Sequence, residues 1–193
     1  MKIGLISDTH IPEAGELPEQ IRELFEGVEL ILHAGDLHIL SVLDWLEEVA
    51  PVWAARGNGD TRCDPDPRMK RSQVLTADGL RIGLTHGLAL PEEPPWRTFE
   101  KIMEKEFGGP VDVLVYGDTH VAGIDNFKGV LLVNPGSPTF PNNLMRVPGT
   151  VGFLEIVEGK ASANLVQLGN PPQMFSQSSS EPRPLPRPRP FIC

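Results

Sequence analysis

Polar side chains that can bind metal ions recur directly after strand-like apolar runs of the sequence. Runs such as LIS, LILHAG, WAARG, IGLT and VLVYG are followed by seven of them: Asp8, His10, Asp36, Asn58, His86, Asp118 and His120. In open α/β sheets, ligands bind outside the carboxyl ends of the strands. Each residue alone is also typical of a turn or a helix cap. Their recurrence at successive strand ends indicates one common site.

The mixture of donor atoms favours divalent metal ions. Carboxylate, amide oxygen and imidazole together suit borderline-hard ions such as Mn²⁺, Fe²⁺ or Zn²⁺, and no thiolate belongs to the set, unlike in a structural zinc site. So many donors exceed the needs of one tetrahedral ion. They fit two ions about 3.5–4 Å apart, bridged by a carboxylate and a water or hydroxide, which polarise a phosphoryl group and activate the nucleophile. The sequence contains no P-loop, nucleophile elbow or Cys-x-x-Cys motif, so P-loop nucleotide hydrolysis and serine hydrolysis find no support.

The first half of the chain alternates strand and helix patterns. Strands are predicted over residues 2–7, 30–33 and 52–55, and helices over 17–25 and 39–49. This alternation predicts parallel βαβ units.

The second half is rich in hairpin signals. Asp78-Gly79, Lys128-Gly129 and Glu158-Gly159 each separate two strand-like runs, which predicts three tight hairpins. A helix over 96–107 and a strand over 111–115 complete the pattern. The whole predicts an α/β fold with a mixed sheet, or two sheets packed face to face between helices.

One folded domain is expected over residues 1–168, followed by a tail over 169–193. Residues 170–193 contain seven prolines, a serine-rich patch and an Arg-Pro alternation. Such a composition cannot bury enough apolar surface to order itself. A disordered tail is the favoured interpretation, and a docking peptide for a protein partner is the alternative.

Composition limits the classes of function. The net charge of −9 argues against broad nucleic-acid binding and against anionic membrane surfaces. The chain has only two cysteines, Cys63 and Cys193, so a disulfide framework is not expected and a reducing cytoplasm is the simpler location. No apolar run approaches the length of about 20 residues that crosses a bilayer.

The ordered set of motifs resembles the calcineurin-like metallophosphoesterases, and within them the small bacterial and archaeal phosphodiesterases. The motifs are Asp8-Thr9-His10, Gly35-Asp36, Gly57-Asn58-Gly59-Asp60, His86-Gly87 and Gly117-Asp118-Thr119-His120, with a similar turn at Asn134-Pro135-Gly136-Ser137. The resemblance implies a four-layer α-β-β-α sandwich of two mixed sheets flanked by helices. It also implies hydrolysis of a small phosphodiester by a hydroxide that bridges two metal ions.

The resemblance assigns roles to individual residues. Asp8, His10 and His120 would bind the first ion, and Asp36 would bridge both ions. Asn58 and His86 would bind the second ion together with residue 118. His10, Asp36 and Asn58 would be the catalytic residues, His10 stabilising negative charge on the phosphoryl oxygens. Manganese is the favoured metal, with iron, zinc or nickel as alternatives.

Two positions depart from the family pattern. Larger relatives have a histidine where this chain has Gly59, and His38 is the candidate substitute as general acid. Asp60 is expected to make supporting hydrogen bonds rather than to bind metal. Asp118 stands where the family usually has histidine; it either binds the second ion and favours Mn²⁺ over Zn²⁺, or leaves that ion short of a ligand.

Other functions on the same fold stay open. The retromer complex contains a subunit with this fold that serves chiefly as a scaffold, so a binding module is one alternative. A phosphomonoesterase or nucleotide pyrophosphatase is another. Cyclic nucleotides are candidate substrates, and a homo-oligomer is possible.

Overall fold

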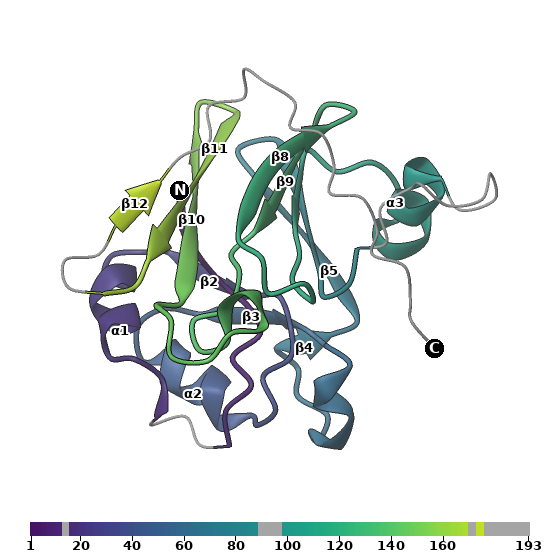
Figure 1. Ribbon diagram of the computed structural model, residues 1–193. Helices are drawn as coiled ribbons and strands as arrows, with labels where there is room; N and C mark the ends of the chain where they lie inside the picture. Colours follow the sequence, from purple (N-terminus) through teal and green to yellow (C-terminus); the bar gives the residue numbers. More distant parts are fainter. Residues whose placement is uncertain (13–15, 89–97, 170–172, 176–193) are drawn as a thin grey trace, which may run out of the picture.

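Two mixed β-sheets form the centre of the protein (Figure 1). The computed structural model describes residues 1–12, 16–88, 98–169 and 173–175. Its α-helices are α1 (Gln20–Phe25), α2 (Ser41–Glu47) and α3 (Phe99–Phe107). Its strands are β1 (Lys2–Ile6), β2 (Leu30–His33), β3 (Val52–Ala55), β4 (Met69–Lys70), β5 (Ser72–Ala77), β6 (Leu80–Thr85), β7 (Val113–Val115), β8 (Gly123–Phe127), β9 (Val130–Asn134), β10 (Thr150–Val157), β11 (Lys160–Gln167) and β12 (Gln173–Phe175).

The strand order brings the carboxyl ends of several strands together. The first sheet has the order β12-β11-β10-β1-β2-β3-β4, and the second has the order β5-β6-β7-β9-β8. Strands β1, β2 and β3 are parallel to one another, and so are β6 and β7. The polar residues that follow these five strands therefore come from two sheets, and not from one sheet edge as the βαβ pattern alone suggests.

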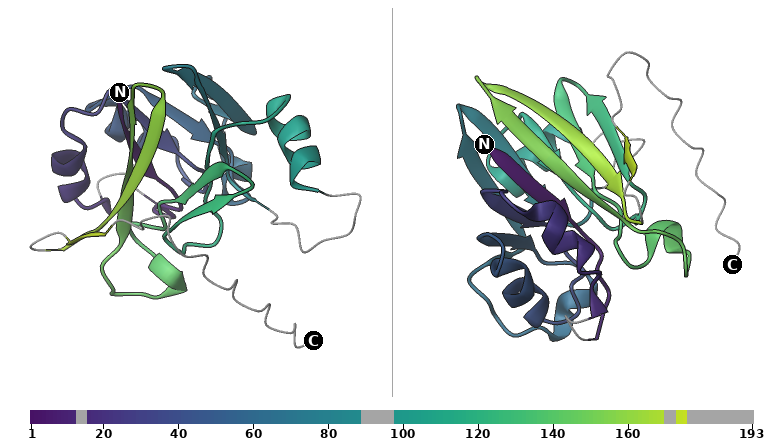
Figure 2. Two further views of the ribbon diagram at one scale, coloured as in Figure 1. Left: turned by 90° about the horizontal axis from the view of Figure 1, so that it is seen from above. Right: turned by 90° about the vertical axis from the view of Figure 1, so that its left-hand side faces the viewer.

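Alternating side chains along the strands build three apolar layers. Ile3 and Leu5 of β1 face the second sheet, whereas Ile6 faces the helices α1 and α2. In β7, Val113 and Val115 join the layer between the sheets, and the neighbouring Leu114 packs towards α3. This period of two buries both faces of each sheet. The result is the expected four-layer sandwich, with α1 and α3 on opposite sides (Figure 2).

The three predicted hairpins are confirmed. Strands β5–β6, β8–β9 and β10–β11 pair antiparallel across Asp78-Gly79, Lys128-Gly129 and Glu158-Gly159. Both residues of each turn have positive φ. That backbone matches the right-handed twist of the flanking strands, which is why glycine follows a residue that tolerates the left-handed conformation.

Some expected boundaries were wrong. Helix α1 begins at Gln20 instead of residue 17, and α2 spans Ser41–Glu47 instead of 39–49. Turn residues precede both helices and also follow α2, so regular α-helical bonding covers a shorter segment. The helix expected from residue 96 begins at Phe99, after Thr98 caps it; residues 96 and 97 lie outside the described residues. The short strand β4 was not predicted.

The expected tail contains a strand. Gln173–Phe175 forms β12 and pairs antiparallel with β11, so the sheet continues past the expected boundary at residue 168. The free edge of β11 offers unpaired N–H and C=O groups that an extended segment can bind. The rest of the predicted tail, 170–172 and 176–193, lies outside the described residues.

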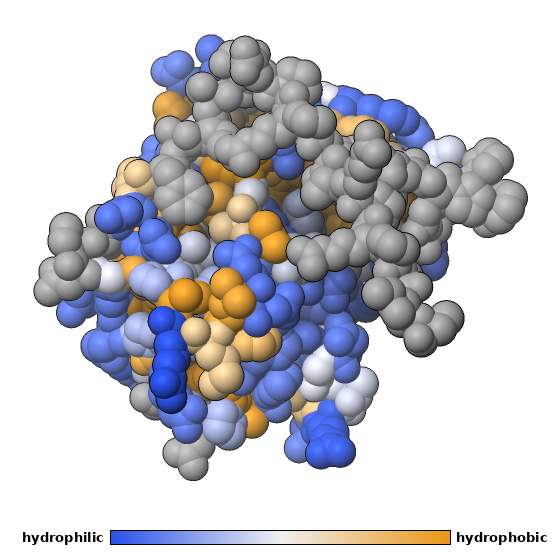
Figure 3. All heavy atoms as spheres, in the orientation of Figure 1, coloured by the Kyte–Doolittle hydropathy of each residue, from blue (hydrophilic) through white to orange (hydrophobic). Residues whose placement is uncertain are grey.

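The surface carries both hydrophilic and hydrophobic residues. Figure 3 shows hydrophilic residues over much of one face, with hydrophobic residues nearer its middle. Among the described residues, no helix is long and apolar enough to cross a membrane.

Candidate metal centre

Three Asp-x-His turns of the same backbone shape form the site. They are Asp8-Thr9-His10, Asp36-Leu37-His38 and Asp118-Thr119-His120, and in each the Asp and the His have φ between 45° and 74°. Positive φ is uncommon for residues other than glycine and is maintained only where surrounding contacts enforce it. The sequence drew attention to the first and third triplets; the structure adds the second as their equivalent.

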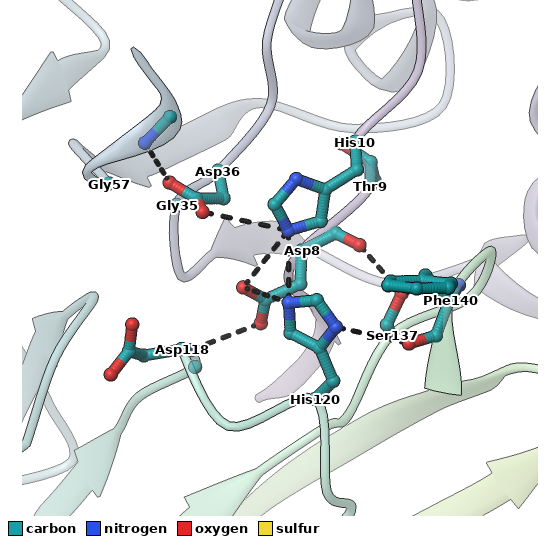
Figure 4. A network of polar contacts seen from close by, with 12 residues as sticks. Asp8, Thr9, His10, Gly35, Asp36, Gly57, Asp118, His120, Ser137 and Phe140 are labelled. Carbon is teal, nitrogen blue, oxygen red and sulfur yellow. Dashed lines mark hydrogen bonds and ion pairs between the residues drawn. The ribbon is translucent and has the colours of Figure 1, made fainter. Parts of the chain in front are cut away.

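Hydrogen bonds join the turns to one another. The Asp8 N–H donates to the Gly35 carbonyl at 2.9 Å, and the His10 N–H donates to the Asp36 carbonyl at 3.2 Å. The Asp118 N–H donates to Asp8 Oδ2 at 3.2 Å, which connects the second sheet to the first (Figure 4). A side chain at Gly117 would overlap Ser7 Oγ. The turns can approach this closely only because residue 117 is glycine.

The Asp60 carboxylate accepts hydrogen bonds from the backbone of the second turn. Its Oδ2 accepts from the N–H groups of Asp36 and Gly57 at 2.9 and 2.8 Å. Its Oδ1 accepts from the N–H of His38 at 3.0 Å. The carboxylate is fully buried. Through these three hydrogen bonds it positions the backbone of the turn.

The first group of candidate ligands is Asp8, His10 and His120. Asp8 Oδ1 lies 3.5 Å from His120 Nε2 and 3.7 Å from His10 Nε2. The two imidazole Nε2 atoms lie 3.0 Å apart. Figure 4 shows both rings converging on the Asp8 carboxylate. These are the three residues to which the resemblance assigns the first ion.

The second group surrounds His86. Its Nε2 lies 3.0 Å from Asn58 Oδ1, 3.5 Å from Asp36 Oδ1 and 3.5 Å from Asp118 Oδ1. Asp118 therefore lies beside the residues expected at the second ion. Its side chain is 54% exposed, which places it at the open rim of the site.

Two carboxylates lie between the groups. Asp36 Oδ2 is 3.5 Å from His10 Nε2, while its Oδ1 is 3.5 Å from His86 Nε2. Asp8 belongs to both groups of potential ligands, the second being Asp8, Asp36 and His86. The resemblance named Asp36 alone as the bridge, whereas the geometry offers Asp8 as a second shared carboxylate.

Two backbone carbonyls determine the tautomers of His86 and His120. His86 Nδ1 lies 2.8 Å from the Ala34 carbonyl, and His120 Nδ1 lies 3.1 Å from the Phe140 carbonyl. A carbonyl oxygen only accepts, so each Nδ1 carries the hydrogen and each neutral ring presents a lone pair at Nε2.

The lone pairs leave the site with an excess of acceptors. His86 Nε2 faces Asn58 Oδ1, another acceptor, and the buried Asp8 Oδ1 has no hydrogen-bond partner among the residues that the structure describes. Unpaired buried acceptors are costly unless a cation compensates them. The donor set therefore fits divalent metal ions.

Electrostatics keep Asp8 ionised. Burial raises the pKa of the Asp8 carboxyl, but electrostatic interactions with the His10 imidazole, the Ser7 hydroxyl and the nearby His86 and His120 rings outweigh it, so the pKa lies below its usual value. The Asp8 carboxylate raises the pKa of His10 against the opposing effect of burial. The carboxylate is thus ready to bind a cation at neutral pH.

His33 is a supporting residue that the sequence did not single out. It is fully buried; its Nδ1 accepts from the Gly35 N–H at 3.1 Å, and its Nε2 lies 3.3 Å from Thr9 Oγ1. Since Nδ1 is the acceptor, Nε2 carries the hydrogen and donates to Thr9. Burial lowers the pKa of His33 to about 4. A histidine inside an otherwise apolar strand was the available signal.

Ser137 also anchors the first turn. Its Oγ donates to the Asp8 carbonyl at 2.6 Å and accepts from the Phe140 N–H at 2.8 Å. The same loop supplies the Phe140 carbonyl that determines the His120 tautomer. The Asn134-Pro135-Gly136-Ser137 turn therefore serves the site through the backbone.

A four-layer sandwich with metal-ligand turns at its strand ends is the architecture of metallophosphoesterases. The calcineurin-like phosphoesterase superfamily domain matches residues 1–159, and the chain belongs to this family. It is 38% identical over 172 residues to a probable metallophosphoesterase of Methanothermobacter thermautotrophicus, covering 89% of this chain and 95% of that protein.

Two further proteins are similar. A phosphodiesterase of Methanocaldococcus jannaschii is 30% identical over 169 residues, covering 80% of this chain and 93% of its own. The structure of Vps29 from Entamoeba histolytica, complexed with Zn²⁺, superposes with a TM-score of 0.69 at 21% identity, covering 91% of this chain and 99% of that one. That likeness concerns the fold.

Proposed function

We propose that the protein is a phosphodiesterase that uses two divalent metal ions to hydrolyse small phosphodiesters. The observation that carries the proposal is the pair of ligand groups that share Asp8 and contact Asp36 from both sides. The similarity to an archaeal phosphodiesterase supports the choice of reaction.

Divalent ions bound here would supply Lewis acidity and a nucleophile at neutral pH. The residues of the chain hold that chemistry in place. Asp8, His10 and His120 form one binding group; Asp36, Asn58, His86 and Asp118 form the other. The backbone bonds to Asp60 and Ser137 keep the turns from shifting, so little reorganisation is needed when substrate binds.

The carboxylate content favours manganese. Asp8, Asp36 and Asp118 would place three negative charges around two dications, and oxygen-rich sites suit Mn²⁺ better than Zn²⁺. Asp118 lies on the His86 side at 3.5 Å, which supports its role as a ligand of the second ion.

The rim of the site is open. The side chain of Asp118 is more than half exposed, and Asn58 is also exposed. An open rim suits small phosphodiesters whose two ester groups both extend into solvent.

The scarcity of cysteine favours the cytoplasm as the location. A protein partner for the Pro/Arg-rich segment 176–193, and a homo-oligomer, are secondary proposals.

A scaffold role is the second candidate, favoured by the likeness to Vps29. Metal-binding groups alone do not separate the two candidates, because that Vps29 structure is complexed with Zn²⁺. The 30% identity to a phosphodiesterase is what favours catalysis.

The test is metal content and hydrolysis by the purified full chain. We expect about two Mn²⁺ per chain and cleavage of bis(4-nitrophenyl) phosphate, both strongly reduced in Asp36→Ala. Asp125→Ala, an exposed acid on β8, is the matched control and should behave as wild type. Stoichiometric metal binding with no cleavage of any phosphodiester, phosphomonoester or pyrophosphate in a substrate panel would favour the scaffold. Faster cleavage of monoesters or pyrophosphates would reassign the substrate class.

A further inference from the structure

The side chain of His38 lies against His10. Its Nε2 is 2.8 Å from His10 Nδ1, and the two rings meet edge to face with centroids 4.5 Å apart. The opposite nitrogen of His10, Nε2, is the one that faces Asp8, Asp36 and His120. His38 is therefore on the outer side of a candidate metal ligand.

The chemistry of imidazole gives this contact a direction. A histidine that binds a cation through Nε2 keeps its hydrogen on Nδ1. His10 then donates Nδ1–H to His38 Nε2, which must present a lone pair. Such a partner determines the tautomer and the ring orientation of a metal-binding histidine and increases its basicity.

The backbone keeps His38 in this position. Its φ is 74°, its N–H donates to Asp60 Oδ1 at 3.0 Å, and its carbonyl accepts from the Cys63 thiol at 3.6 Å. The left-handed conformation directs the side chain towards His10 although the residue is exposed. His38 is thus held by the same carboxylate that supports Asp36.

Gly59 leaves room for the ring. A Cβ atom at position 59 would lie 2.8 Å from His38 Nε2 and 2.9 Å from His38 Cδ2. Gly59 does not have positive φ, so an alanine would be tolerated by the backbone itself. A side chain there would instead displace the His38 ring and, at 3.1 Å, press on Asp36 Oδ1.

We propose that His38 is a positioning residue that accepts the Nδ1–H of His10, and that position 59 is glycine because His38 occupies the adjacent space. The proposal rests on the metal centre of the proposed function. If His38 accepts this hydrogen bond, it does not also act as the general acid. A histidine acts as a general acid in its imidazolium form, which has no lone pair for His10, so one conformation cannot serve both roles.

The experiment compares three variants in the full chain. His38→Gln keeps an acceptor at similar reach, His38→Leu keeps bulk without an acceptor, and Gly59→Ala displaces His38 while leaving its chemistry intact. Mn²⁺ affinity is measured by calorimetry in the absence of substrate. The dependence of kcat on leaving-group pKa is measured with a series of aryl phosphodiesters.

We expect His38→Leu to weaken Mn²⁺ binding by about 10–100-fold and His38→Gln to remain within a few-fold of wild type. Gly59→Ala should resemble His38→Leu, and the double variant His38→Leu/Gly59→Ala should bind no more weakly than His38→Leu alone. The leaving-group dependence should be unchanged in His38→Gln.

Unchanged Mn²⁺ affinity in His38→Leu, or equal weakening in Leu and Gln, would overturn the proposal. A steeper leaving-group dependence in both variants with normal metal binding would instead identify His38 as the general acid. Metal binding by wild type without phosphodiester hydrolysis would refute the proposed activity but not the positioning role. No Mn²⁺ binding by wild type would overturn both.

Discussion

Removing the Asp60 carboxylate is expected to destabilise the fold and the metal site together. In Asp60→Ala, the N–H groups of Asp36, Gly57 and His38 lose their acceptor. The bonds from Asp36 and Gly57 are buried, and leaving a buried donor unsatisfied costs about 1–3 kcal/mol. The two together predict a loss of about 2–6 kcal/mol, a large part of the stability of a typical domain.

The asparagine variant is the matched comparison. Asp60→Asn can place its amide oxygen where Oδ2 now accepts two buried N–H groups, and loses only the bond to His38. It should therefore be destabilised less than Asp60→Ala. Asp125→Ala, exposed and distant in sequence, should change the free energy of unfolding by no more than about 0.5 kcal/mol.

The assay is urea unfolding in the presence of a chelator, with the midpoint and slope fitted for each variant. Working without metal separates the hydrogen bonds from ligand-linked stability. A difference of less than about 1 kcal/mol between Asp60→Ala and wild type at equal slope would refute the reasoning. It would mean that water replaces the carboxylate at these N–H groups.

Three further predictions concern metal and pH. Mn²⁺ at about 100 times its dissociation constant should stabilise the protein by about 2.7 kcal/mol for each ion bound. A chelator should reverse this shift in the unfolding midpoint. Asp118→His should raise the Zn²⁺-to-Mn²⁺ affinity ratio, whereas Asp118→Ala should lower Mn²⁺ stoichiometry; calorimetric stoichiometry unchanged in both would remove Asp118 from the ligand set. His33 has a pKa depressed to about 4 by burial, so the unfolded state binds its proton first and stability should fall as the pH drops from about 6.5 to about 4. His33→Asn should flatten this pH dependence of the unfolding midpoint, and an unaltered slope would contradict the assignment.

The amino-acid sequence carries much of the fold in local signals. Turn pairs such as Asp78-Gly79 specify hairpins because both residues must adopt positive φ. Apolar runs such as residues 30–32 of β2 specify buried strands because side chains on both faces of the strand are apolar. The end of the folded region was less predictable, because it depends on pairing with another strand. Strand β12 forms because the edge of β11 is available for pairing.

The sequence by itself also identified the chemistry of the site. Carboxylate, amide and imidazole side chains after apolar runs are visible without coordinates. Asp118 could be named as an unusual residue, and the family resemblance grouped it with His86 at the second ion. The structure supplies the distance, 3.5 Å between their side chains, because the parallel strands β6 and β7 that precede them lie side by side.

Only the tertiary structure decided how these groups are held. Carbonyls of Ala34 and Phe140 determine the histidine tautomers, and Asp60 supports a turn that lies 24 residues earlier in the chain. His38 shows the difference most clearly: the sequence offered it as a candidate general acid two residues after Asp36, whereas folding places its ring against His10 and beside Gly59. Residue type determines what an atom can bind, but donor and acceptor roles depend on neighbours that only the packed strands bring within hydrogen-bond distance.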